Sequence, residues 1–551
     1  MLPPPAIRGV YRTDQRARAA YSEGAGIYRI LPLAVCRPAD LDDLRLAICW
    51  AADHRVPLVP RGAGSAMGGG NVGDGVIVDL TQMAGRRLEI EAPKQRAVTS
   101  AGVTLAELNT AASRFGLRLP PDPSSGGWAT LGGMVSTNAA GARSVRYGSV
   151  RRWVEAVSLL TADGDTVMLR REASGMAAAR PTALARFERE AAPRIRAAAP
   201  LIAARFPHTR KNSSGYALDA YIQSGSVLDL IVGSEGTLGI VTEIEWRLDA
   251  IPGHRAGLRV ALRSLDHLSD LVRAMAELQP SALELLDRSF LDLVGTSTLA
   301  GAGLGFPGAD AVLLVEFERN DPESLRRAVE TATARARPLA HSVDSAFSAA
   351  AADRLWAIRH AASPILAALP QHKRSLQVIE DGCVPLDRVS DYIRSVRQAA
   401  AARAIPVVMF GHAGDGHIHV NLLPDVGQQG WEQAVTGLME EVTGAVVRLG
   451  GTPSGEHGDG RLRASTLVQV YGSEVVELFR LVKRSFDPLG IFNPGIILPS
   501  GEAPISRLKV GSGAVQLPSD VEHGLREIER SGGYGRSRLE LAGEEGPGSR
   551  V

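Results

Sequence analysis

The sequence contains few cysteines and no excess of charge of either sign. Its 551 residues include only Cys36, Cys49 and Cys383, and no two of these lie close together along the chain. A disulfide framework or a cysteine-ligated zinc or iron–sulfur cluster therefore cannot be assembled within the chain. Lysine and arginine number 61 against 60 aspartates and glutamates, which gives a net charge of +1. Because no positive surplus exists to neutralise a phosphate backbone, we do not expect nucleic-acid binding.

Long apolar runs are also absent from the sequence. No run approaches the roughly 18 residues that a membrane-spanning helix needs, and no charged start followed by an apolar stretch marks a secretion signal. We therefore expect a cytoplasmic protein whose only membrane contact is peripheral, at the inner face of the membrane. The apolar content of 45% and the chain length indicate several domains, each with a substantial core.

The pattern of apolar residues and glycines divides the chain into five segments. Residues 1–30 are interpreted as an N-terminal arm, and residues 31–252 as an α+β unit. The pattern restarts over residues 253–428, which predicts a second unit with a small sheet and helices on one side. Residues 429–500 are predicted to be a helical segment that returns to close the first unit, and residues 501–551 a peripheral tail.

Periodicity and capping residues predict individual elements within these segments. Thr104 followed by Glu107 is typical of a capping box that opens a helix, which Gly116 would close. Other helices are expected from about residue 40 and over 264–278, 321–335, 385–403, 430–449, 472–485 and 518–530. Strands are expected at 56–59, 76–80, 240–248, 257–262, 311–317, 405–410 and 417–423.

Three glycine-rich loops occur in the first unit. The loop Pro60-Arg61-Gly62-Ala63-Gly64-Ser65 follows a predicted strand, so its backbone N–H groups can converge on an anion without Cβ obstruction. Residues 131–141 and 233–242 combine glycines with hydroxyl and amide side chains in a similar way. The first loop lacks the third glycine of the dinucleotide-binding fingerprint and the Gly-Lys-Ser/Thr end of a triphosphatase loop. Together the three loops indicate an extended cofactor with a diphosphate in its middle.

Histidines are concentrated near the end of the second unit. Four of the twelve, His412, His417, His419 and His457, fall within 46 residues. With strand periodicity, His417, His419 and Asn421 share one face, and His412 at the entry to a glycine turn can fold back towards that face. The neighbouring loop carries Glu456 beside His457. Two imidazoles and a carboxylate with open positions are typical of a catalytic divalent-metal site. Asp415 and Asp459, each between glycines, are interpreted as turn residues.

These loops resemble the FAD-binding domain of the vanillyl-alcohol-oxidase (PCMH-type) family. The resemblance includes Pro121-Asp122-Pro123 before the second loop and Tyr147-Gly148 after it, and it extends from about residue 21 to residue 500. It implies an α+β fold: a PCMH-type domain of two α+β subdomains, a ferredoxin-like cap domain for the substrate, and a C-terminal helical segment that returns to the FAD domain. It also implies FAD contacts from Pro60, Arg61, Gly62, Ala63, Gly64, Ser65, Pro121, Asp122, Gly132, Gly133, Ser136, Thr137, Asn138, Gly141, Glu235, Gly236, Thr237, Gly239, Ile240, Val241 and Asn493.

Some members of this family bond FAD covalently through a histidine or cysteine near these loops. Neither residue type occurs in residues 60–75 or 120–148 of this sequence. The resemblance therefore implies FAD that is bound without a covalent link.

The motif Gly-His-x-Gly-Asp-Gly-x-x-His and a later Gly-Glu-His-Gly resemble one branch of the family, which contains D-lactate, glycolate and D-2-hydroxyglutarate dehydrogenases. That resemblance implies a divalent metal, zinc, bound by His412, His419 and Glu456, with His457 as the base that removes the substrate hydroxyl proton. It further implies that Arg359 binds the substrate carboxylate and that Asn421 orients the substrate. His417 stands where the family usually has asparagine, so it either adds a ligand or lines the pocket.

The implied reaction is oxidation of a 2-hydroxy acid to the 2-keto acid by hydride transfer to flavin N5. Electrons would then leave to an external acceptor, namely a quinone, an electron-transfer protein, a cytochrome or an iron–sulfur protein, and the chain would act as a homodimer. Two alternatives stay open: a non-redox FAD enzyme of the alkyl-dihydroxyacetonephosphate synthase type, and a flavin- or metal-binding protein without turnover. Glu456 favours the dehydrogenase, because the synthase branch carries consecutive histidines in that loop.

Overall fold

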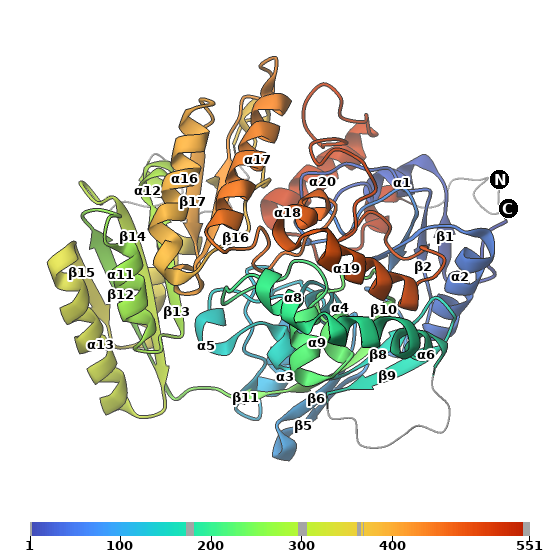
Figure 1. Cartoon of the computed structure of the whole chain (residues 1–551), viewed down its shortest axis with the longest axis horizontal. Helices are drawn as coiled ribbons and strands as arrows, with labels where there is room; N and C mark the ends of the chain where they lie inside the picture. Colours follow the sequence, from blue (N-terminus) through green and yellow to red (C-terminus); the bar gives the residue numbers. More distant parts are fainter. Residues whose placement is uncertain (1–2, 172–180, 296–305, 361–364, 367–368, 544–551) are drawn as a thin grey trace.

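The computed structural model describes residues 3–171, 181–295, 306–360, 365–366 and 369–543. Its N-terminal unit, residues 31–252, contains two larger sheets, the first of which is extended by a strand of the N-terminal arm (Figure 1). A short pair, β7 (Leu117–Arg118) and β11 (Asp249–Ala250), is separate from both. The first sheet has the order β1 (Val10–Arg12), β2 (Ala34–Arg37), β4 (Val76–Asp79), β3 (Leu58–Arg61), and its last three strands are parallel. The second is antiparallel, with the order β5 (Leu88–Glu91), β6 (Arg96–Ser100), β10 (Ile240–Arg247), β8 (Val154–Leu160), β9 (Thr166–Arg170). Strands and helices in two subdomains confirm the α+β class.

The capping residues of the N-terminal unit act as the sequence predicts. Asp40 caps α2 (Leu41–His54), and Thr104 and Glu107 form a reciprocal capping box at the start of α3 (Leu105–Ser113). The second glycine-rich block, expected to be a loop, instead contains α4 (Leu131–Thr137) and α5 (Ser144–Tyr147). Thr130 caps α4, and Gly132 allows close packing, because a Cβ on it would lie 2.6 Å from the Ala101 Cβ.

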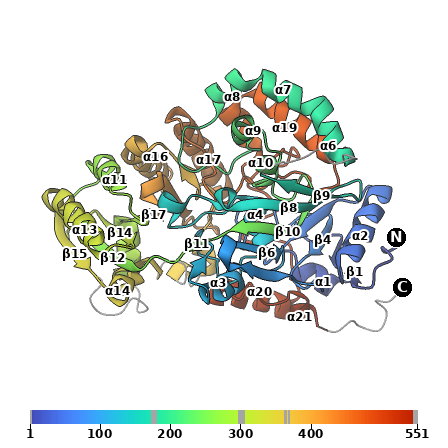
Figure 2. The same ribbon diagram turned by 90° about the horizontal axis from the view of Figure 1, so that it is seen from below.

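Residues 181–231 fold into short helices that the sequence analysis did not predict. Helices α7 (Ala192–Ala197), α8 (Ala199–Arg205) and α9 (Leu218–Ser224) lie with α19 (Ser473–Phe486) over one side of the antiparallel sheet (Figure 2). Buried Phe479 of α19 belongs to the same apolar core as Val157 and Ile244 of the sheet. The C-terminal segment therefore returns to the N-terminal unit through α19. Helix α17 (Trp431–Arg448) instead packs on the cap unit, in the core that contains Val396 of α16 (Val389–Ala401).

The cap unit, residues 253–428, is built on a seven-stranded sheet. Its order is β15 (Ala340–Ala346), β12 (His254–Leu262), β14 (Ala311–Arg319), β13 (Ala282–Asp287), β17 (Val407–Gly411), β18 (His417–Leu422), β16 (Gly382–Cys383). Helices α11 (Leu268–Ala276), α13 (Pro322–Ala336) and α16 share a core with Leu283 and Leu285 on one face. The expectation of helices on one side only is wrong. Leu286 of the opposite face packs with α12 (Arg288–Gly295) and α14 (Ala349–His360).

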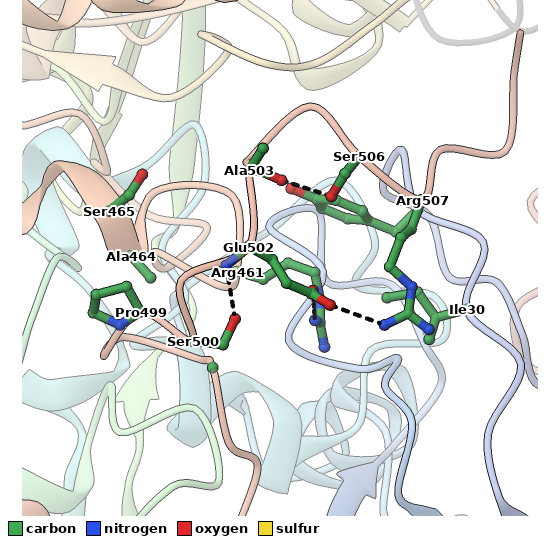
Figure 3. Close-up of a pocket in the computed structure, with 12 residues that line it drawn as sticks. Ile30, Arg461, Ala464, Ser465, Pro499, Ser500, Glu502, Ala503, Ser506 and Arg507 are labelled. Carbon is green, nitrogen blue, oxygen red and sulfur yellow. Dashed lines mark hydrogen bonds and ion pairs between the residues drawn. The ribbon is translucent and has the colours of Figure 1, made fainter. Parts of the chain in front are cut away.

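The prediction of a peripheral tail after residue 500 is also wrong for the residues that the structure describes. The tail starts against the N-terminal arm, where the Tyr28 hydroxyl donates to the Pro504 carbonyl at 2.8 Å. Glu502 lies between Arg461 and Arg507, with N–O distances of 3.9 and 3.5 Å (Figure 3). Helix α20 (Ser519–Ser531) then buries its apolar side against the arm helix α1 (Gln15–Ala20).

Spacing explains how α20 packs. Val521 and Leu525 are four residues apart, so they lie on the same side of the helix, and both are buried in a core with Ala17 and Tyr21. The short helix α21 (Leu539–Ala542) follows and adds Ala542 to this core. Within the described part of the chain, no helix has the length and apolar content that crossing a membrane requires.

The packing of α20 predicts that Leu525→Ala destabilises the protein. Truncating a buried leucine removes apolar contacts and leaves a cavity, at a cost of about 2–4 kcal/mol in the free energy of unfolding. Urea denaturation followed by circular dichroism measures this loss. The matched control is Val515→Ala, whose side chain is 41% exposed and whose truncation should cost less than about 0.5 kcal/mol. An equal effect of the two substitutions would contradict the packing of the tail.

Candidate active site

A cavity of about 850 Å³ lies between the N-terminal and cap units. Its wall is formed on one side by the three glycine-rich loops and on the other by strands β17 and β18, helix α14 and the loop around Glu456. A cavity of this size holds an extended cofactor together with a small substrate. The predicted site residues that line it are Pro60, Arg61, Gly62, Ala63, Gly64, Ser65, Asp122, Gly132, Gly133, Ser136, Thr137, Gly141, Glu235, Gly236, Gly239, Ile240, Val241, Arg359, His412, His419, Asn421, Glu456 and His457.

The first glycine-rich loop presents free backbone donors to this cavity. Among the described residues, no hydrogen bond is donated by the N–H groups of Gly62, Ala63, Gly64 and Ser65, although Ala63 and Gly64 are buried. Buried N–H groups need acceptors, so the loop is incomplete without an anionic ligand. The Arg61 side chain donates to the carbonyls of Tyr21, Glu23 and Asn71, which fixes the strand before the loop. This arrangement fits the pyrophosphate of FAD.

Four of the predicted cofactor residues, Pro121, Asn138, Thr237 and Asn493, do not line the cavity. Three of them hydrogen-bond to neighbouring residues, which for Asn493 are the lining residues Gly70 and Glu235. Asn138 accepts a bond from the Arg151 amide, and the Thr237 hydroxyl lies 2.7 Å from the Tyr216 hydroxyl. Asn493 Nδ2 donates to the carbonyls of Gly70 and Glu235, both at 2.8 Å. The structure therefore places these three side chains as supports of the loops.

Three electron-rich atoms converge on one point of the cavity. His412 Nε2 lies 3.1 Å from Glu456 Oε1 and 3.3 Å from His419 Nε2, and His419 Nε2 lies 3.5 Å from the same carboxylate oxygen. All three side chains are buried. Bonds of about 2.0–2.1 Å in a tetrahedral site separate neighbouring ligands by about 3.4 Å. The triangle therefore has the dimensions of a zinc-type ligand set.

The other ring nitrogens of these histidines are already occupied by acceptors. His412 Nδ1 lies 2.5 Å from Glu284 Oε1, and His419 Nδ1 lies 2.9 Å from the carbonyl of Glu380. Because a carboxylate and a carbonyl only accept, both Nδ1 atoms carry the proton and both Nε2 lone pairs can face the centre of the triangle. Metal-binding histidines have this tautomer as a rule. Burial lowers the pKa of His412, but the Glu284 carboxylate outweighs burial and raises it to about 9.

Glu456 is held by two donors on its second oxygen. Its Oε2 accepts from Lys211 Nζ at 2.8 Å and from the Gly141 amide at 2.9 Å, which leaves Oε1 for the triangle. The Lys211 side chain is itself buried, and its ammonium also lies 3.6 Å from Asp415 Oδ2. Although Asp415 sits in a turn as predicted, its charge thus contributes to the site. Glu284, Glu380 and Lys211 were missed by the sequence analysis, because none belongs to a local motif.

His457 lies beside the triangle with a carboxylate behind it. Its Nδ1 is 2.7 Å from Glu380 Oε2, and its Nε2 is 3.7 Å from Glu456 Oε1. Burial lowers the pKa of His457, but the carboxylates of Glu380 and Asp381 outweigh burial and raise it to about 10. In the chain alone the ring is therefore cationic at neutral pH. A positive charge at the triangle would oppose this and favour the neutral ring.

Arg359 and Asn421 line the cavity together with Phe410 and His419 of the cap unit. Arg359 Nε donates to Glu284 Oε2 at 2.9 Å, and its guanidinium carbon lies 4.6 Å from the centre of the Phe410 ring. Asn421 accepts a bond from the Ser375 hydroxyl at 2.9 Å. Glu284 thus links Arg359 to His412, so the predicted carboxylate-binding arginine is fixed next to the triangle.

His417 does not line the cavity. Its side chain is completely buried, with Nε2 at 2.9 Å from Asp381 Oδ1 and Nδ1 at 4.0 Å from Glu456 Oε1. Burial, together with His419, lowers the pKa of His417 to about 3, so the ring is neutral. His417 is therefore not a pocket-lining residue, but its ligand atom lies within 4.8 Å of those of His412, His419 and Glu456, so its role as an added ligand stays a prediction.

The fold and the cavity define a flavin-dependent class of protein: an α+β unit with an open pyrophosphate loop, facing a cap that carries acid–base groups. Comparisons with known proteins agree. Residues 32–170 match the family described as "FAD binding domain", and residues 251–497 match "FAD linked oxidases, C-terminal domain".

Relatives and solved structures were also found. The chain is 30% identical to a D-lactate dehydrogenase of Archaeoglobus fulgidus, over 84% of this chain and 91% of that protein. It is also 30% identical to the glycolate oxidase subunit GlcD of Bacillus subtilis, over 85% and 89%. A D-2-hydroxyglutarate dehydrogenase of Escherichia coli is 28% identical over 95% of this chain, which spans 54% of that longer protein. The chain belongs to this family of FAD-linked oxidoreductases.

The fold of an alkyldihydroxyacetonephosphate synthase is also similar. The TM-score is 0.58 at 16% sequence identity, over 88% of this chain and 83% of that one. This likeness supports the shared architecture of the FAD-binding and cap units.

The open pyrophosphate loop predicts that Gly62→Ala reduces FAD binding. A Cβ at residue 62 would lie 2.1 Å from Thr130 Oγ1, so the loop must shift and its amides lose their common direction. We expect at least a tenfold weaker FAD affinity, measured by flavin fluorescence on reconstitution of the apoprotein. Gly513→Ala is the control, because a Cβ there meets nothing within 4 Å. Wild-type FAD affinity in Gly62→Ala would contradict the assignment of this loop.

Proposed function

We propose that the protein is an FAD-dependent dehydrogenase that oxidises a 2-hydroxy acid to the 2-keto acid, with a divalent cation bound by His412, His419 and Glu456. The observation that carries the proposal is the convergence of those three lone-pair atoms in the cavity that the glycine-rich loops line. Relatives named as D-lactate dehydrogenase, glycolate oxidase subunit and D-2-hydroxyglutarate dehydrogenase support the substrate class.

The donor set supports zinc as the cation. Two neutral imidazoles and one carboxylate, with at least one open position facing a cavity, are typical of catalytic zinc. When bound, such a cation lowers the pKa of a hydroxyl that coordinates it. Lys211 and the Gly141 amide keep Glu456 monodentate, since they occupy its second oxygen.

Substrate binding, substrate orientation and proton transfer are assigned to three side chains of the cap wall and the Glu456 loop. The Arg359 guanidinium binds the substrate carboxylate, and Asn421 orients the substrate from the neighbouring strand. His457 accepts the hydroxyl proton at Nε2, because Glu380 holds Nδ1 protonated and fixes the direction of the ring. When bound, FAD supplies the acceptor for the hydride. The loop amides fix its pyrophosphate, which sets the distance between flavin and substrate.

FAD that has accepted the hydride would need an external electron acceptor to be reoxidised. We propose a quinone, an electron-transfer protein, a cytochrome or an iron–sulfur protein in the cytoplasm or at the inner face of the membrane. A non-redox reaction of the synthase type is less well supported, since Glu456 completes a cation site that such chemistry does not use.

Anaerobic titration of the purified protein with 2-hydroxy acids tests the reaction. We expect bleaching of the flavin absorbance by at least one D-2-hydroxy acid, and a loss of bleaching after treatment with a strong chelator that zinc then restores. Absence of bleaching with every acid would refute the dehydrogenase. Bleaching that chelation leaves unchanged would refute the cation while leaving the flavin reaction intact.

Substitution of one ligand tests the cation site without turnover. His419→Ala should lower zinc affinity at least a hundredfold, because it removes one of three ligands, while the FAD content stays at the wild-type level. Zinc content by inductively coupled plasma mass spectrometry and calorimetric titration measure the effect. His523→Ala, an exposed histidine on α20, is the control. Unchanged zinc affinity in His419→Ala would remove these residues as ligands.

The ion pair between Lys211 and Glu456 leads to a separate prediction for Lys211→Met. Loss of the ammonium frees Oε2 and leaves Glu456 without its buried counter-charge, so the carboxylate binds the cation in a less fixed geometry. We expect a tenfold to hundredfold loss of zinc affinity, with a smaller loss in Lys211→Arg. Calorimetric zinc titration measures both, and an equal affinity of all three proteins would contradict this role.

A further inference from the structure

The charges that surround the cavity are nearly balanced. Eight carboxyl groups line it, against six arginines and the two histidines with a raised pKa, His412 and His457, with no lysine among the described residues. A second substrate carboxylate would therefore gain no attraction from an overall excess of positive charge. It would need an arginine whose donors are not already in use.

Most of the cavity arginines are already paired. Arg143 binds both Asp122 and Glu316, and Arg255 binds Asp353 at 2.7 Å and Glu316 at 3.4 Å. Arg61 donates to backbone carbonyls beneath the first loop.

Arg374 is paired with Glu529 of α20, so the tail itself supplies the neutralising charge. Glu529 also binds Lys509 at 3.0 Å and Arg526 at 2.7 Å, which holds it firmly in place.

Two arginines remain. Among the described residues, no hydrogen bond engages the two terminal nitrogens of Arg359, which are needed for the reacting carboxylate of the substrate. Arg530 is exposed at the end of α20, near Tyr534, whose ring stacks on Trp128 next to the start of α4. Arg530 also lines the cavity, but its side chain is exposed to solvent.

The wall next to Arg359 is apolar. Trp356, Leu366 and Phe410 all line the cavity and belong to one buried cluster, and Phe410 also packs on His419 with a ring separation of 5.6 Å. The polar groups opposite, Ser375, Gln377 and Asn421, are uncharged. A substrate held between Arg359 and the histidines therefore directs its side chain towards apolar or neutral groups.

We propose that the substrate is a 2-hydroxy monocarboxylate with a hydrogen or an apolar side chain, and that Glu529 excludes dicarboxylates by neutralising Arg374. This inference rests on the proposed function and adds selectivity to it. Glycolate, lactate and their longer aliphatic homologues fit the cavity. The distal carboxylate of a 2-hydroxy dicarboxylate would meet Arg374, which Glu529 already engages, or Arg530, whose exposed charge is screened by solvent. A carboxylate that is buried without a partner is costly.

Steady-state dye reduction with purified holoenzyme tests the selectivity. The panel contains glycolate, D-lactate, D-2-hydroxybutyrate, D-malate and D-2-hydroxyglutarate, and the measured quantity is kcat/KM. We expect values for the best monocarboxylate at least tenfold above those for both dicarboxylates. A dicarboxylate that equals or exceeds the monocarboxylates would overturn the inference while leaving the dehydrogenase reaction in place.

If no acid is turned over, the proposed function fails, and binding still tests the charge argument. The same acids are then titrated against the flavin absorbance at equilibrium. Tighter binding of dicarboxylates than of monocarboxylates would overturn the selectivity, and the reverse order would support it.

The variant Glu529→Gln tests the role of the tail. It keeps the shape of the side chain and releases Arg374 from its partner, so the ratio of kcat/KM for D-2-hydroxyglutarate to that for D-lactate should rise at least fivefold. Glu527→Gln, an exposed neighbour on the same helix, should leave this ratio within twofold of wild type. A ratio that Glu529→Gln does not change would overturn the assignment of Glu529.

Discussion

The site depends on one electrostatic constraint, the placement of three lone pairs within 3.5 Å of each other in a buried position. Two imidazole nitrogens and a carboxylate oxygen repel one another unless a positive charge lies between them. Glu284 and the Glu380 carbonyl fix the two rings, and Lys211 fixes the carboxylate. Each of these contacts turns a ring nitrogen or a carboxylate oxygen towards the same point, which supports the cation that we propose for this site.

The same contacts join the two units of the protein. Glu456 accepts from Gly141 of the N-terminal unit, and Glu235 of the third glycine-rich loop accepts from the amides of Asp459 and Gly460, just after the histidine loop. Burial raises the pKa of Glu235 to about 8. The loop that carries Glu456 and His457 is therefore held against the cofactor loops by hydrogen bonds. The cofactor cavity and the acid–base groups therefore form one site. Helix α20 lines a third side of this cavity.

Much of the site could be predicted from local sequence. Period-two spacing placed His419 and Asn421 on one strand face, and the glycine pattern indicated the open pyrophosphate loop. Lys211, Glu284 and Glu380 could not be predicted, because each is an isolated charged residue that only the tertiary fold brings to the histidines; Lys211 and Glu456 are 245 positions apart. The tail was misjudged for a similar reason. Val521 and Leu525 have helical spacing, but their partner helix α1 lies at the opposite end of the chain.

The most direct test of the account is anomalous X-ray diffraction from zinc-loaded crystals, collected on either side of the zinc absorption edge. The account predicts one strong anomalous peak at about 2.0–2.2 Å from His412 Nε2, His419 Nε2 and Glu456 Oε1, the bond lengths of zinc to nitrogen and oxygen ligands. A difference map without a peak between these three atoms, or with zinc bound elsewhere, would contradict it.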